Sequence, residues 1–294
     1  VNNETLGGDY LVISLGADLA PETIPGLEDG GHNIYTLAGC EAFRDEFQGF
    51  KKGKLAVVVS SVPFKCPAAP YEAAMLMAYD LRKRKVREQV QIDLFAAEAG
   101  PMGVAGPELS GAVRRMVEDR GIGYHPEHVI KGVDSGRGRL AFANGVEAAY
   151  DLLAYVPPHR APAAVRETGL LGESGWVPVD RETMETSVAG VYAIGDVTGI
   201  SLKLGKPLPK AGTFAHAQAE VVAHNIACQV LGKGRPRRFD GGGECFIEMG
   251  EGKAGFARGN FYAEPLPQVK MYKPGRHWHA GKVLFEKNWL RKWF

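Results

Sequence analysis

The sequence predicts an α/β fold in which parallel strands alternate with helices. Apolar runs rich in β-branched residues alternate along the chain with helical patterns, as βαβ units require. Glycine is abundant, with 38 residues among 294, which suits the tight turns between strand and helix. The hydrophobic share of 45% and the charged share of 23% are those of a globular protein with a substantial core.

The first half of the chain supplies the clearest strand and helix. The β-branched run at 55–60 is typical of a strand buried in a parallel sheet. A helix is predicted at 70–84, because Pro70 suits a first turn and the basic residues at its end suit the C-terminal end of the helix dipole. The neighbouring elements are predicted as strands at 9–17 and 90–95 and a helix at 108–120.

The second half continues the alternation. Short apolar runs predict strands at 150–156 and 191–194. A long helix is predicted at 211–231, and Gly232 ends it. A sequence rich in Arg, Pro and Gly at 235–243 is typical of a linker.

Residues 191–197, Val-Tyr-Ala-Ile-Gly-Asp-Val, form the most informative motif. Gly195 turns the chain and places Asp196 at the carboxyl end of the strand, where ligands bind in open α/β sheets. The helix that follows starts at Lys210, Ala211 and Gly212. It directs its first backbone N–H groups and the positive end of its dipole into the same crevice. This combination fits a cofactor with a sugar-like chain and a ring that gains negative charge, such as a flavin dinucleotide.

The 191–197 motif resembles the second FAD motif of the pyridine nucleotide-disulfide oxidoreductase superfamily. Residues 64–72, Phe-Lys-Cys-Pro-Ala-Ala-Pro-Tyr-Glu, resemble its sulfide branch, which holds sulfide:quinone oxidoreductases and the flavoprotein subunits of flavocytochrome c sulfide dehydrogenases. The resemblance runs from about Asp9 to the C-terminus. It implies two Rossmann-like domains, the first incomplete, and a small C-terminal α+β module. It also implies FAD as cofactor, sulfide oxidised to zero-valent sulfur or polysulfide, and quinone or a c-type cytochrome as acceptor.

The first FAD motif of that superfamily, G-x-G-x-x-G, is absent from the sequence. Residues 9–17 resemble the strand that ends the family's first FAD segment, and Gly16 is expected among the cofactor-binding residues. We therefore expect a truncated chain that lacks about a hundred N-terminal residues, and FAD binding that is weak or absent in it. The expected domains are a partial FAD-binding domain at 1–19 and 146–235, a central NAD-like Rossmann domain at 20–145, and a C-terminal module at 236–294.

Cys66 lies in the turn between the predicted strand at 55–60 and the helix at 70–84. This turn contains no glycine and has prolines that lack N–H groups, which argues against NAD(P) binding there. The helix N-terminus and Lys65 would both favour a thiolate at Cys66. The alternative is a buried, inert cysteine.

The resemblance implies a second redox cysteine in the C-terminal module, and Cys245 is the match. The sequence does not establish that Cys245 meets Cys66. The resemblance also places a carboxylate near the first cysteine as an acid–base group, and Glu72 has that position, although an exposed helix glutamate is an equal alternative. Cys40 and Cys228 are expected to be structural.

Residues 281–294 carry apolar side chains at helical spacing with lysines and arginines between them. This pattern fits a helix at a membrane interface or one packed on its own core or on a second copy in a homo-oligomer. No apolar run in the sequence is long enough to span a bilayer. The net charge of +1 does not indicate nucleic-acid binding, and the spacing of the cysteines does not indicate a metal site. A peripheral membrane or periplasmic location is favoured, with the soluble cytoplasm as the alternative.

Two other functions compete with sulfide oxidation. One is an NADH:quinone reductase-like flavoprotein, which the glycine-free turn before Cys66 disfavours. The other is a non-catalytic remnant that has lost its FAD.

Overall fold

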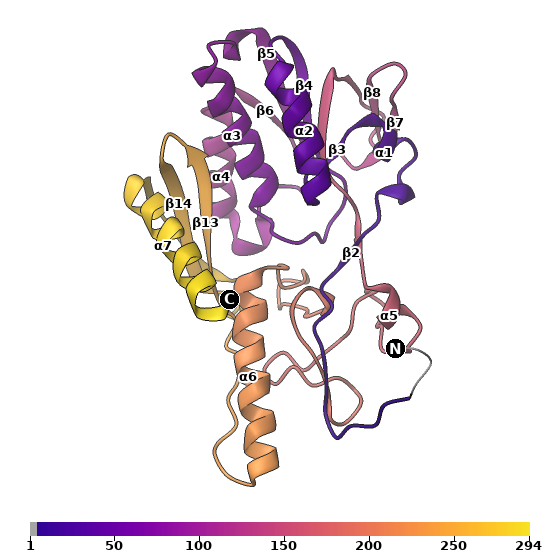
Figure 1. Ribbon diagram of the computed structural model, residues 1–294, viewed down its shortest axis with the longest axis vertical. Helices are drawn as coiled ribbons and strands as arrows, with labels where there is room; N and C mark the ends of the chain where they lie inside the picture. Colours follow the sequence, from indigo (N-terminus) through magenta and orange to yellow (C-terminus); the bar gives the residue numbers. More distant parts are fainter. Residues whose placement is uncertain (1–4) are drawn as a thin grey trace.

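The computed structural model describes residues 5–294 and confirms the α/β fold (Figure 1). Its largest unit is built on a five-stranded sheet in which every neighbouring pair is parallel. The order across this sheet is β3 (His32–Asn33), β10 (Leu152–Val156), β4 (Gly53–Val59), β5 (Val90–Ala96) and β6 (Ile122–His125). The apolar runs predicted as strands at 55–60 and 90–95 therefore form the centre of the molecule.

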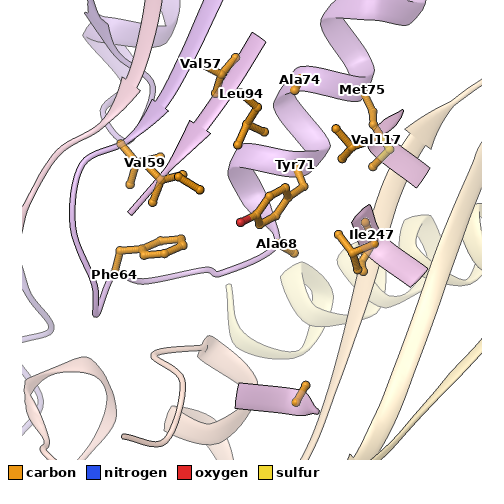
Figure 2. Close-up of a cluster of buried hydrophobic side chains, with 14 of the residues drawn as sticks. Val57, Val59, Phe64, Ala68, Tyr71, Ala74, Met75, Leu94, Val117 and Ile247 are labelled. Carbon is orange, nitrogen blue, oxygen red and sulfur yellow. The ribbon is translucent and has the colours of Figure 1, made fainter. Parts of the chain in front are cut away.

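Helix α3 (Ala69–Lys83) packs its apolar face on this sheet. Tyr71, Ala74 and Met75 are fully buried at helical spacing, so one side of α3 is continuous with the core. Figure 2 shows these side chains gathered with Val57 and Leu94 of the strands. Helices α2 (Leu37–Gly49) and α4 (Pro107–Glu118) complete this layer.

The other face of the sheet carries a small antiparallel sheet. It is formed by β7 (Ile130–Asp134), β8 (Arg139–Phe142) and β9 (Glu147–Ala149), beside the short helix α1 (Leu27–Gly30). Val58, Phe95 and Phe142 form its buried contact with the central strands.

The pairing of β10 bears on the domain boundary expected at residue 146. β10 pairs with both β3 and β4, so residues 152–156 lie inside the central sheet. All five residues of β10 are buried, and an apolar run of this kind does not reveal which sheet it joins. We propose three domains as expected from the sequence, with this boundary moved past β10.

The unit expected from the sequence to be a partial FAD-binding domain contains few strand pairs. β1 (Leu11–Ile13) pairs in parallel with β12 (Val191–Ala193), and β2 (Asp18–Leu19) pairs antiparallel with β11 (His159–Arg160). Helix α6 (Gly212–Leu231) runs from this unit away from the central sheet (Figure 1). The remaining short helices are α5 (Ala163–Arg166), η1 (Pro21–Thr23), η2 (Arg87–Gln89), η3 (Gly103–Ala105) and η4 (Gly195–Val197).

The C-terminal module is the α+β unit that was expected. Strands β13 (Gly242–Gly250), β14 (Lys253–Asn260) and β15 (Gln268–Gly275) form an antiparallel sheet in sequence order. Helix α7 (Arg276–Trp293) lies along β14 and β13, where Trp278 stacks on Phe256 with ring centres 4.3 Å apart (Figure 1). β13 packs against α3, which brings the C-terminal module to the turn that holds Cys66.

Candidate functional site

The pairing of β1 with β12 places Gly16 and Asp196 at the same edge of the sheet. Ile13 pairs with Ala193, and Gly16 and Asp196 each follow three residues later. A Cβ atom at Gly16 would meet nothing within 4 Å, so a ligand can approach its backbone closely. This is the carboxyl edge at which nucleotide cofactors bind in such folds.

Gly195 forms the turn that carries Asp196. Its φ of 73° is in the left-handed region, where glycine is favoured. Its amide donates to Oε1 of Gln218, 2.8 Å away, and this glutamine of α6 is only 1% exposed. The turn is therefore fixed to α6 by a buried hydrogen bond.

Lys210 ties the start of α6 to the same turn. Its Nζ donates to the carbonyl oxygens of Asp196 at 2.6 Å and Thr198 at 3.1 Å, and it lies 3.3 Å from the centre of the Trp176 ring. Burial lowers the pKa of Lys210 to about 7, although the Asp196 carboxylate opposes this shift. The lysine thus ties the loop after Asp196 to the start of α6 while still lining the adjoining cavity.

A cavity of about 420 Å³, here named the Cys66 cavity, joins the predicted cofactor residues to the predicted redox cysteine. Cys66 shares it with four of the six predicted cofactor residues, whereas Gly16 and Gly195 lie outside its lining. Its lining residues are Ile34, Tyr35, Thr36, Leu37, Cys40, Lys65, Cys66, Ala69, Asp196, Lys210, Ala211 and Gly212.

The turn holding Cys66 is bonded directly to the cofactor region. The Cys66 amide donates to the carbonyl oxygen of Lys210 at 2.8 Å, and the Tyr35 hydroxyl donates to the Cys66 carbonyl oxygen at 3.1 Å. Cys66 has a φ of 50°, a strained value for a residue with a side chain, which such contacts maintain. The position of this cysteine relative to the start of α6 is therefore fixed by the backbone.

The surroundings of Cys66 contradict the expectation that its thiolate is favoured. Its side chain opens into the Cys66 cavity, but the surrounding protein and Glu72 raise the pKa of the thiol. The Ala69 amide at the start of α3 lowers it, as expected of a helix N-terminus, and the cation that lowers it is Lys282 instead of Lys65. The net shift is upward, opposite to the expected direction, because burial outweighs both stabilising groups.

Cys245 and Glu72 lie in the same neighbourhood as Cys66. Burial raises the pKa of Cys245, and the charges of Glu72 and Cys66 raise it further. Glu72 is not an exposed helix residue, because its side chain is only 15% exposed. Its Oε1 accepts from the amide of Glu248 at 2.7 Å and from Nζ of Lys282 at 3.2 Å. α3 thus presents a carboxylate to both thiols.

Three further residues near the site were not predicted as site residues: Tyr35, Lys282 and Cys40. Cys40, expected to be structural, lines the Cys66 cavity and donates its Sγ–H to the carbonyl oxygen of Ile34 at 3.3 Å. Lys282 is 210 positions from Glu72, so no local pattern could have linked them. Cys228, in contrast, lies on α6 beside His224, at 3.4 Å, away from this site.

A second cavity of about 430 Å³, here named the Cys245 cavity, is lined in part by Cys245, the other predicted redox cysteine. Its walls are mainly apolar and come from the loops after β4 and β5, the start of α6 and the C-terminal sheet. They include Pro63, Phe64, Phe214, Phe261, Val269 and Cys245. Glu98 is on this wall and accepts a hydrogen bond from the buried Tyr71 hydroxyl.

Glu98 is expected to make stability depend on pH. Burial raises its pKa from 4.5 to about 7, so its contribution is complete below the unfolded value and is lost as the pH rises through 7. The free energy of unfolding should fall between about pH 5 and pH 8 by at most about 3 kcal/mol from this group. Urea titrations of the parent and Glu98→Gln should diverge with pH, the variant gaining relative stability above neutrality. Parallel curves would contradict the assignment.

Comparisons with known proteins identify the family of this chain. Residues 1–220 match the family model described as pyridine nucleotide-disulphide oxidoreductase. The chain is 26% identical to the mitochondrial sulfide:quinone oxidoreductase of Mus musculus, over 87% of this chain and 58% of that protein. It is 27% identical to the sulfide-quinone reductase of Aquifex aeolicus, over 97% of this chain and 68% of that protein. The chain therefore spans less than two thirds of the mouse protein's length.

Two solved structures resemble the fold. The sulfide:quinone oxidoreductase of Aquifex aeolicus superposes with a TM-score of 0.84 at 23% identity, covering 99% of this chain and 70% of that one. A NAD-dependent persulfide reductase from A. fulgidus gives a TM-score of 0.61 at 20% identity, covering 89% and 45%. With the family model matching most of its length, the chain belongs to the pyridine nucleotide-disulphide oxidoreductase family.

Proposed function

We propose that this protein is a flavin-dependent oxidoreductase that oxidises sulfide to zero-valent sulfur through Cys66 and Cys245 and delivers the electrons to quinone. The observation that supports it most is the bond from the Cys66 amide to the Lys210 carbonyl. This bond fixes the redox cysteine beside the start of α6, in the cavity that Asp196 also lines. The names of the relatives in mouse and Aquifex aeolicus support sulfide as donor and quinone as acceptor.

The residues present fit FAD. Asp196 would accept hydrogen bonds from the hydroxyls of a ribityl chain or ribose, and the open backbone at Gly16 would allow close approach of the cofactor. The first turn of α6, at Gly212, would direct N–H groups at developing negative charge. When bound, FAD supplies the ability to accept two electrons and pass them on.

The cysteines would begin the reaction as a disulfide. Hydrosulfide attacks the Cys245 sulfur, forms a persulfide there, breaks the bond between the two cysteines and releases Cys66 as a thiolate. This direction of cleavage places the thiolate in the Cys66 cavity and the added sulfur in the apolar Cys245 cavity. Glu72 would accept the proton of the persulfide, because it is the carboxylate that raises the pKa of both thiols.

Helix α7 supports contact with a membrane surface, where a quinone would be reached. Leu284, Phe285 and Leu290 are each more than half exposed, and Arg291 and Lys292 lie on the same helix. No helix within residues 5–294 is long and apolar enough to cross a bilayer. We propose that α7 lies flat on the membrane.

NADH is disfavoured as electron donor. The turn after β4 contains no glycine, as the sequence already indicated. Glu98 follows β5, where dinucleotide-binding domains place the carboxylate that holds a ribose, but this carboxylate already accepts from Tyr71.

An anaerobic titration tests the proposed function. The protein expressed from its complete gene and loaded with FAD is mixed with sulfide, and the visible absorption band of the flavin is followed. We expect sulfide to bleach the band and NADH to leave it unchanged. Bleaching by NADH with no response to sulfide would instead support an NADH:quinone reductase.

A further inference from the structure

Lys282 connects the C-terminal helix to the cysteines. Helix α7 has no buried residue, and much of its apolar surface faces solvent. Yet Lys282 Nζ lies 3.2 Å from Oε1 of Glu72 on α3, and this same oxygen accepts the Glu248 amide of β13 at 2.7 Å. Three elements that are distant in sequence therefore meet at one carboxylate oxygen.

The groups facing Cys66 come from every element packed around it. Glu72 of α3 and Asp196 after β12 raise the pKa of its thiol, whereas the Ala69 amide and Lys282 lower it. From β13, the Cys245 thiol lies close enough for the two cysteines to influence each other. The Tyr35 hydroxyl donates to the Cys66 carbonyl oxygen, and burial keeps that phenol neutral by raising its pKa.

The charge of Lys282 acts on the pKa of both cysteines in the same direction. Within residues 5–294, it is the one cation that lowers the pKa of Cys66 and of Cys245. Glu72 raises the pKa of both cysteines. Because Lys282 and Glu72 are in direct contact, the lysine both offsets the carboxylate charge and holds its Oε1 in place.

Loss of this cation would leave the site with uncompensated negative charge. A thiolate forming at Cys66 would face the carboxylates of Glu72 and Asp196 in a partly buried place, where like charges repel strongly. With Lys282 present, its ammonium offsets part of the effect of the Glu72 carboxylate on both thiols. Reactivity of the cysteine then depends on a residue of α7.

We propose that Lys282 is the positioning residue of the cysteine site: it holds Glu72 against the Glu248 amide and supplies the positive charge beside which the Cys66 thiolate forms. The functional meaning of this assignment rests on the proposed redox role of Cys66. The C-terminal helix is then part of the reactive site as well as a surface element.

The reaction of Cys66 with iodoacetamide across a range of pH tests this assignment. Peptide mass analysis follows Cys66 separately from the other cysteines in the parent, Lys282→Met and Lys282→Arg. We expect Lys282→Met to move the alkylation profile to higher pH and to slow alkylation at about pH 8 by about three- to tenfold. Lys282→Arg should stay within about twofold of the parent, because it keeps the charge.

Lys287→Met is the matched control, because this lysine lies on the same helix and is exposed. The alkylation of Cys66 in Lys287→Met should follow the same pH profile as in the parent. Equal profiles for Lys282→Met and the parent would overturn the assignment, and so would an equal shift in Lys287→Met. Alkylation requires neither sulfide nor flavin, so this result is independent of the proposed function. Normal alkylation without sulfide-dependent bleaching would count against the proposed function alone.

Discussion

Replacing Cys66 with serine should lower the rate of sulfide-dependent flavin reduction by at least about a thousandfold, equivalent to about 4 kcal/mol in the activation barrier. A serine hydroxyl forms no disulfide, so hydrosulfide has no sulfur–sulfur bond to attack. Stopped-flow absorbance of the FAD-loaded protein under anaerobic conditions measures the rate directly.

The matched control for this experiment is Cys228→Ser. Cys228 lies on α6 beside His224 and outside both cavities. We expect its rate to stay within about twofold of the parent. A Cys66→Ser protein that kept a tenth or more of the parent rate would remove Cys66 from the electron path.

Tyr71→Ala should produce the largest loss of stability in the central domain. Its ring is fully buried in the core between α3 and the sheet (Figure 2), and its truncation leaves a cavity that costs about 3–5 kcal/mol. Tyr71→Phe removes only the hydrogen bond to Glu98 and should cost about 1–2 kcal/mol. Urea unfolding gives both values.

Leu76→Ala provides the comparison on the same helix. Leu76 is 41% exposed, so its truncation should change the free energy of unfolding by less than about 1 kcal/mol. A loss for Tyr71→Ala no greater than that for Leu76→Ala would show that the cluster in Figure 2 does not support the fold.

The sequence predicted the elements whose local pattern is strong. β4, α3, β5 and α6 lie within a few residues of their predicted ranges, because β-branched runs, helical spacing and end signals act over short distances. β10 was predicted as a strand, but the sequence did not indicate that it joins the central sheet. Its five buried residues fit any parallel sheet, and only tertiary pairing with β3 and β4 decides its position.

The candidate site was predictable to the extent that it rests on motifs. The motif at 191–197 and the turn with Cys66 marked two loops, and the structure bonds the Cys66 turn to Lys210, two residues before α6. The contact of Lys282 with Glu72 was beyond prediction, because it depends on how α7 packs on another domain. The direction of the pKa shift of Cys66 was also predicted wrongly, because burial and the charge of Glu72 depend on the folded structure and not on the local sequence.

Peptide mapping without reduction, after mild oxidation of the protein, tests the central claim most directly. All four cysteines are free thiols in this structure, and a disulfide forms only between cysteines whose Cα atoms come within about 7 Å. The redox-pair proposal predicts a linked peptide that contains Cys66 and Cys245 and disappears on reduction. A link from Cys66 to Cys40, with Cys245 left as a free thiol, would contradict it.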